Sequence, residues 1–70
     1  MDTQKLIYMV NQISNYFNSY PEEKAIISIT NHINQFWDKR MKKQIILYVK
    51  NDGDGINPLA LIAIKNLEKI

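Results

Sequence analysis

The stretch FWDKRM at residues 36–41 decides how the middle of this chain folds. Asp38 can act as an N-cap, because its carboxylate can accept a hydrogen bond from a backbone N–H in the first turn of a helix that begins at Lys39. Nothing else between Phe36 and Arg40 breaks a helix, so a single bent helix is the alternative. We therefore predict two helices, the second and third of the chain, joined by a tight turn at Asp38.

Apolar residues on both sides of this turn recur at helical spacing. The upstream helix is predicted from about Glu22 to Phe36, because Pro21 suits a helix start. Glu22 and Glu23 lie in its first turn, where negative charge interacts favourably with the positive end of the helix dipole. Its apolar face comprises Ala25, Ile26, Ile29, Ile33, Phe36 and Trp37. The downstream helix is predicted from Lys39 to about Lys50, with an apolar face of Met41, Ile45, Tyr48 and Val49, and with Ile46 at its edge.

Two further helices are predicted nearer the ends of the chain. The first runs from Thr3 to Ser19, with Asp2 or Thr3 as its N-cap. Its apolar face comprises Leu6, Met9, Val10, Ile13, Tyr16, Phe17 and then Tyr20. The last runs from Leu59 to about Glu68, after the loop at 51–55, the cap Asn57 and the helix-opening Pro58. Because this last helix is apolar almost all round, it must be buried in this chain or against another.

No segment alternates apolar and polar residues long enough to predict a strand. The expected fold class is therefore all-α, a small bundle of four short helices that forms a single helical domain over residues 1–70. A chain of 70 residues is too short to enclose a large catalytic cavity, and without cysteine it has no disulfide or thiolate metal site. Its longest apolar run, residues 59–64, is far shorter than the ~20 residues of a membrane span. We expect a soluble, cytoplasmic protein with no membrane partner.

The residues that could carry chemistry form no recognisable active site. His32 follows Ser28 by one turn, but no acidic group or glycine-rich oxyanion turn accompanies the pair, so we expect a partly buried histidine rather than a catalytic one. No metal-binding side chain lies three or four residues from His32. The loop at 51–55 has the look of a calcium loop, but Ile56 occupies a ligand position and no bidentate Glu follows. We predict no catalytic, cofactor or metal site, and therefore no enzyme activity for the chain alone.

The third predicted helix begins with a cluster of cations, at Lys39, Arg40, Lys42 and Lys43. Positive charge is unfavourable at a helix N-terminus. Lys39, Arg40, Lys43 and Lys50 lie opposite the apolar face, and Leu47 lies among them. Ile7, Asn11 and Ile27 also lie off their apolar faces. We predict a contact surface for an acidic partner; the alternatives are a merely solvated basic face, a helix-turn-helix-like nucleic-acid-binding module and a self-associating helical module.

A series of residues in this order resembles the delta subunit of NAD-dependent, molybdenum-containing formate dehydrogenases. The series is Asn11-Gln12-Ile13, Phe17, Pro21, Ala25, Ile29, His32-Ile33, Phe36-Trp37-Asp38, Arg40-Met41, Val49, Gly53, Gly55 and Pro58-Leu59. It covers nearly the whole chain and is densest over residues 32–41. The chain departs from the family at Lys39, where proline is usual, and at Asp52 and Asp54, which make the loop more acidic.

The resemblance implies a non-catalytic accessory subunit of the formate dehydrogenase complex. In that family the molybdenum cofactor and iron–sulfur clusters belong to the large subunit, and the flavin and NAD site to others, so this chain is expected to hold no cofactor. Its expected partner is the molybdenum-containing catalytic subunit, with self-association left open and nucleic acid not expected. The candidate partner-binding residues are Asn11, His32, Trp37, Asp38, Arg40, Met41, Lys43 and Leu47. Of these, Arg40 and Asn11 are expected to face outward, whereas Trp37 and Met41 suit the core equally well.

Overall fold

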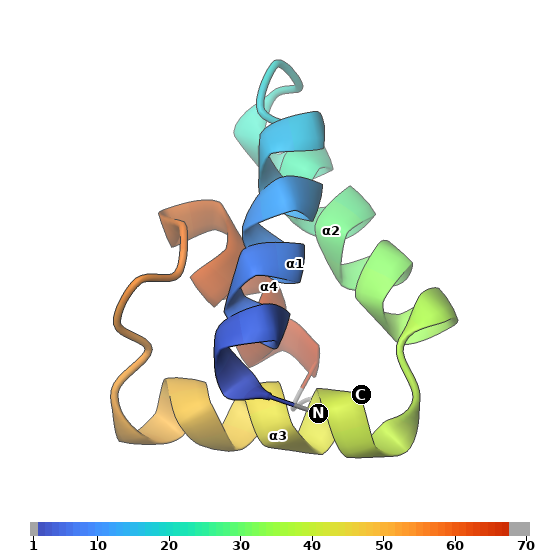
Figure 1. Ribbon diagram of the computed structural model, residues 1–70. Coiled ribbons are helices and arrows are strands. Elements are labelled where there is room, and N and C mark those ends of the chain that lie inside the picture. The colour runs from blue at the N-terminus through green and yellow to red at the C-terminus, as the bar shows by residue number, and fades with distance from the viewer. Residues whose placement is uncertain (1, 68–70) are drawn as a thin grey trace.

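The computed structural model describes residues 2–67, and within this range the chain forms four α-helices and no strand (Figure 1). The helices are α1 (Thr3–Tyr16), α2 (Glu22–Phe36), α3 (Lys39–Asn51) and α4 (Pro58–Leu67). The predicted all-α bundle is therefore confirmed. The bounds of α2 agree with the prediction, whereas α1 ends at Tyr16, three residues before the predicted Ser19.

The two middle helices are separate, as the cap at Asp38 predicts. Trp37 has an extended backbone, with φ −94° and ψ 138°, and its N–H still donates to the Ile33 carbonyl at 2.9 Å. The Asp38 carboxylate then accepts a hydrogen bond from the Met41 N–H at 2.9 Å. Two extended residues, of which Asp38 also supplies the capping side chain, therefore turn the chain between α2 and α3. The alternative of one bent helix is wrong.

Helix α4 lies against all three other helices, and its packing against α2 is the most extensive in the molecule. Small residues allow this close approach, since Ala25 of α2 and Ala60 and Ala63 of α4 are completely buried. Thr30 is also buried here, and its hydroxyl donates to the Ile26 carbonyl at 2.7 Å. The apolar last helix thus packs within this chain, where Ala60, Ala63, Ile64 and Leu67 are buried and Ile62 is 39% exposed.

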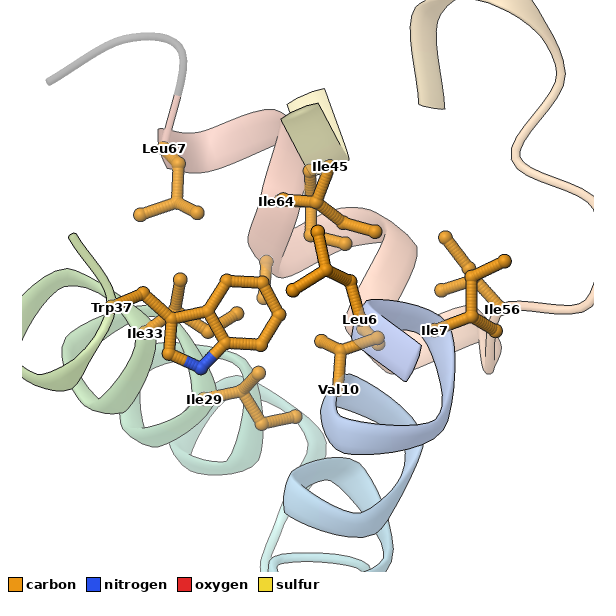
Figure 2. Packing of buried hydrophobic residues seen from close by; sticks show 12 residues of the cluster. Leu6, Ile7, Val10, Ile29, Ile33, Trp37, Ile45, Ile56, Ile64 and Leu67 are labelled. Carbon is orange, nitrogen blue, oxygen red and sulfur yellow. The ribbon is translucent and has the colours of Figure 1, made fainter. Parts of the chain in front are cut away.

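Trp37 lies in the middle of the core that the four helices share. Figure 2 shows its indole ring among Ile29 and Ile33 of α2, Leu6 of α1 and Ile64 of α4. Only 5% of the Trp37 surface is exposed, and the four aliphatic side chains are completely buried. The residue that ends α2 therefore also ties α2 to α1 and α4.

The division between core and surface differs from the prediction at several positions. Tyr16, Tyr20 and Phe36 are exposed, although the apolar periodicity places them on buried faces. Ile7 is buried, although it lies off the predicted face, because the segment before α4 covers that side of α1 with Ile56 (Figure 2). Ile27 is exposed as predicted, at 59%. Helical spacing identifies apolar faces, but the neighbouring segments decide how far around each helix burial extends.

No helix in residues 2–67 combines the length and the apolar character that crossing a membrane requires.

Candidate functional site

The eight predicted partner-binding residues fall in four different places. His32, Trp37 and Met41 line an open groove beside α1 and α2, and Arg40, Lys43 and Leu47 lie on α3. Asp38 serves as the cap of α3, and Asn11 holds the segment before α4. The structure therefore brings His32, Trp37 and Met41 together in the groove. It brings Arg40, Lys43 and Leu47 together on α3.

The groove, which we call the α1–α2 groove, consists of two adjoining hollows. One has a volume of about 460 Å³ and is lined by Gln12, Ile13, Tyr16, Phe17 and His32. The other, of about 430 Å³, shares Gln12, Ile13 and His32 and adds Tyr8, Met9, Phe36, Trp37 and Met41. No Asp, Glu, Lys or Arg side chain lines either hollow. The groove is therefore an uncharged, largely apolar surface.

The groove arises from the way in which α1 and α2 diverge. The two helices meet at the turn over residues 17–21 and separate toward α3, as Figure 1 shows. Both pack against α4, and α1 makes less contact with α2 than α2 makes with α4. Facing side chains on α1 and α2 are consequently only partly covered, and Met9, Ile13 and Phe17 contact the core without being fully buried.

Aromatic rings dominate the exposed surface of the groove. Tyr8, Tyr16 and Phe36 are 64%, 75% and 66% exposed. Exposed apolar side chains that gather in one place are typical of an interaction surface. Tyr16 packs edge-on against Phe17 with ring centroids 4.9 Å apart. The half-buried His32 ring lies 4.7 Å from the Phe36 ring, measured between centroids. His32 thus joins an aromatic surface.

Sequence reasoning missed several groove residues for an identifiable reason. Helical periodicity places Tyr16 and Phe36 on buried faces, and it predicts no role for Tyr8 or Gln12. A usable signal was present in α1, where Tyr8, Gln12 and Tyr16 follow one another at four-residue intervals beside the parallel row Met9, Ile13 and Phe17. Such a double row is wider than the stripe that one neighbouring helix covers.

The second candidate surface is the outer face of α3, defined by Lys39, Arg40, Lys43, Leu47 and Lys50. All five residues are exposed, and Leu47 is 61% exposed, in agreement with the predicted outward orientation of Arg40. Lys43, Ile46, Leu47 and Lys50 line a shallow hollow of about 310 Å³ on this face. Lys42 lies off the face, and its ammonium group donates to the Asn34 carbonyl at 3.3 Å and to the Asn34 amide oxygen at 3.2 Å.

Asn11 does not face outward, so this prediction was wrong. It is half-buried, and both ends of its side-chain amide bind the segment between α3 and α4. Its Nδ2 donates to the Gly55 carbonyl at 2.9 Å, and its Oδ1 accepts from the Asn57 N–H at 2.8 Å. The periodicity of α1 could not reveal this role, because it depends on a segment 44 residues away in the chain.

The same segment is held at its other side by Tyr48. The Tyr48 hydroxyl donates to the Asp54 carbonyl at 2.7 Å. Burial raises the pKa of this hydroxyl above its usual value, and the nearby carboxylates of Asp52 and Asp54 raise it further because they disfavour a tyrosinate. Tyr48 and Asn11 thus fix the path by which the chain returns to α4.

The residues on these two surfaces are suited to binding another molecule. Among residues 2–67, no three His, Asp or Glu side chains gather closely enough to hold a metal ion. The α1–α2 groove offers apolar and aromatic surface, with Gln12 and His32 as hydrogen-bonding groups at its centre. The outer face of α3 offers cations around an apolar hollow.

These features define a small all-helical protein with an uncharged aromatic groove on one side and a cationic helix on another. Residues 5–64 match the family described as NADH-dependent formate dehydrogenase delta subunit, FdsD. Since the match spans most of the 70 residues, the chain belongs to this family, and the predicted resemblance is confirmed. No curated protein and no solved structure matches the chain.

Proposed function

We propose that this protein is a non-catalytic accessory subunit that binds a formate dehydrogenase complex through its α1–α2 groove and supports the assembly, stability or activity of that complex. The observation that carries the proposal is the uncharged groove, in which the exposed rings of Tyr8, Tyr16 and Phe36 surround half-buried side chains. Membership of the delta subunit family supports the identity of the complex.

Burial of this surface would favour association. Removing apolar surface from water contributes about 25 cal/mol per Å², so one aromatic side chain that becomes buried contributes about 1.5–3 kcal/mol. Aromatic residues are enriched at the centres of interfaces, where charged residues are depleted. A groove without charged lining therefore suits an apolar segment of the partner, whose few polar groups could bind Gln12 or His32.

The partner that we propose is the molybdenum-containing catalytic subunit. The groove-lining residues Gln12, Ile13, Phe17, His32, Phe36, Trp37 and Met41 belong to the series on which the resemblance to the delta subunits rests. Trp37 is almost completely buried, so its contribution to binding is to shape the groove rather than to provide exposed area.

A charge placed in the groove tests the proposal. Phe36→Lys should abolish co-purification of the tagged chain with a co-expressed formate dehydrogenase, because an ammonium group would be transferred into an apolar interface. Ile27→Lys is the matched control, since it adds the same charge to an exposed apolar position of the same helix outside the groove. Circular dichroism should show equal helical content for both variants.

Co-purification of Phe36→Lys at the level of the unsubstituted chain would contradict the use of the groove. Failure of the unsubstituted chain to co-purify, together with unchanged activity and molybdenum content of the complex when the chain is deleted, would contradict the accessory role itself. Light scattering on the isolated chain tests the alternative of self-association, which predicts a dimer that Phe36→Lys dissociates.

A further inference from the structure

Helix α3 has a charge distribution that the groove does not explain. Five of the nine Lys and Arg residues of the chain lie in α3, and none of the seven Asp and Glu residues does. The rest of the chain therefore has a net negative charge, although the whole has a charge of +2. No acidic residue occupies the first turn of α3, so the cations there add to the positive end of the helix dipole instead of opposing it.

The cations surround an apolar centre. Ile45 is completely buried on the inner side of α3, and Lys39, Arg40, Lys43, Leu47 and Lys50 are exposed on the opposite side. In Figure 1, α3 lies across the base of the molecule, and only one of its sides faces the other helices. The hollow lined by Lys43, Ile46, Leu47 and Lys50 has an apolar floor, to which the aliphatic parts of the lysines contribute.

We propose that the outer face of α3 is a second binding surface, which takes an acidic segment of another subunit with an apolar side chain of that segment seated against Leu47. The charges select carboxylates, and the hollow selects one apolar side chain between them. A nucleic acid would satisfy the cations, but phosphate binding leaves the exposed Leu47 without a role. The inference rests on the proposed function, because it takes the partner from the same complex.

The test measures binding of the purified full chain to formate dehydrogenase prepared without the delta subunit. The double substitution Arg40→Glu with Lys43→Glu should weaken binding about tenfold or more, since like charges would then face each other across the interface. Binding of the unsubstituted chain should weaken between about 0.05 M and about 0.3 M NaCl, and that of the variant should change less, because salt screens exposed charges. Leu47→Ala should weaken binding about fivefold and should keep the salt dependence of the unsubstituted chain.

The matched control is Lys24→Glu with Lys65→Glu, which changes the net charge equally at exposed positions outside α3 and should leave the affinity within about twofold. If charge reversal on α3 and this control have equal effects, the inference is wrong and the groove alone accounts for binding. If the unsubstituted chain does not bind at all, the proposed function fails and this inference fails with it. Tight binding of a labelled DNA duplex that Arg40→Glu with Lys43→Glu abolishes, with complex binding unchanged, would also overturn the inference.

Discussion

Gly53 shows at the scale of one residue how the end of α3 is built. Its φ of 76° lies in the left-handed region, and its N–H donates to the Tyr48 carbonyl at 3.0 Å. A Cβ placed on Gly53 would lie 3.0 Å from Cδ2 of Leu61. Gly55 has a similar φ of 82°, but a Cβ there would meet nothing within 4 Å. Backbone conformation and close packing therefore both disfavour a side chain at Gly53, whereas only backbone conformation disfavours one at Gly55.

Gly53→Ala should accordingly reduce the free energy of unfolding more than Gly55→Ala does. A left-handed backbone costs an ordinary residue about 1–2 kcal/mol, which applies to both variants. Crowding against Leu61 should add about 1 kcal/mol for Gly53→Ala. Urea denaturation monitored by circular dichroism gives both values. Equal losses would mean that Leu61 moves aside at no cost.

Ser14 is a buried polar residue on α1. Only 1% of it is exposed, and its hydroxyl oxygen has no hydrogen-bond partner among residues 2–67. An unsatisfied buried hydroxyl is destabilising, and alanine is the better helix former. Ser14→Ala should therefore raise the free energy of unfolding by about 1 kcal/mol. A lower melting temperature for this variant would show that the hydroxyl forms a stabilising contact.

At the scale of elements, the junction of α2 and α3 consists of two residues, Trp37 and Asp38, both with an extended backbone. Asp38 has φ −77° and ψ 174°, an extended conformation that the residue before a proline prefers. Lys39 is the first residue of α3, the helical position at which proline is best tolerated. The backbone of this chain is thus already arranged for a proline at position 39.

Lys39→Pro should therefore leave the fold intact and raise the free energy of unfolding by about 0.4–1 kcal/mol, because proline restricts the unfolded chain. Lys39→Ala is the control, since it removes the same charge without restricting the backbone. Thermal unfolding of both variants measures the difference. A Lys39→Pro variant less stable than Lys39→Ala would mean that α3 begins at a different residue in solution.

At the scale of the whole molecule, the Trp37 side chain packs at the place where α1, α2 and α4 meet. Trp37 follows α2 and packs against α1 and α4, so its removal would open the shared core (Figure 2). A domain of this size has a small total free energy of unfolding. The neighbouring Phe36 is 66% exposed and contributes little to that core.

Trp37→Ala should cost about 3–5 kcal/mol, enough to unfold much of the population. Phe36→Ala should cost less than about 1 kcal/mol, although it removes a ring from the adjacent position. Circular dichroism and melting temperature distinguish the two. Similar melting temperatures would contradict the burial of Trp37. If both variants fold, Phe36→Ala should weaken binding to the complex more than Trp37→Ala does.

The candidate site was only partly predictable from the sequence. Membership of the delta subunit family followed from residues 11–59, and His32 and Met41 do line a groove. Helical periodicity places Tyr16 and Phe36 in the core and Asn11 at the surface, whereas both rings are exposed and Asn11 is half-buried. The exposure of these side chains depends on where the helices diverge and on which distant segment covers them. The pattern of residues within one helix does not contain this information.

Local sequence signals are enough to specify the number of helices and most of their ends, because caps and breakers such as Asp38, Pro21 and Gly53 act on the backbone within a turn or two. They also specify the cationic outer face of α3, since one periodicity places those side chains opposite Ile45. Which apolar residues remain exposed depends instead on how the helices pack against one another. A side chain is buried only where a neighbouring segment lies over it. Because α1 and α2 diverge, the side chains that face each other across the α1–α2 groove remain partly or largely exposed.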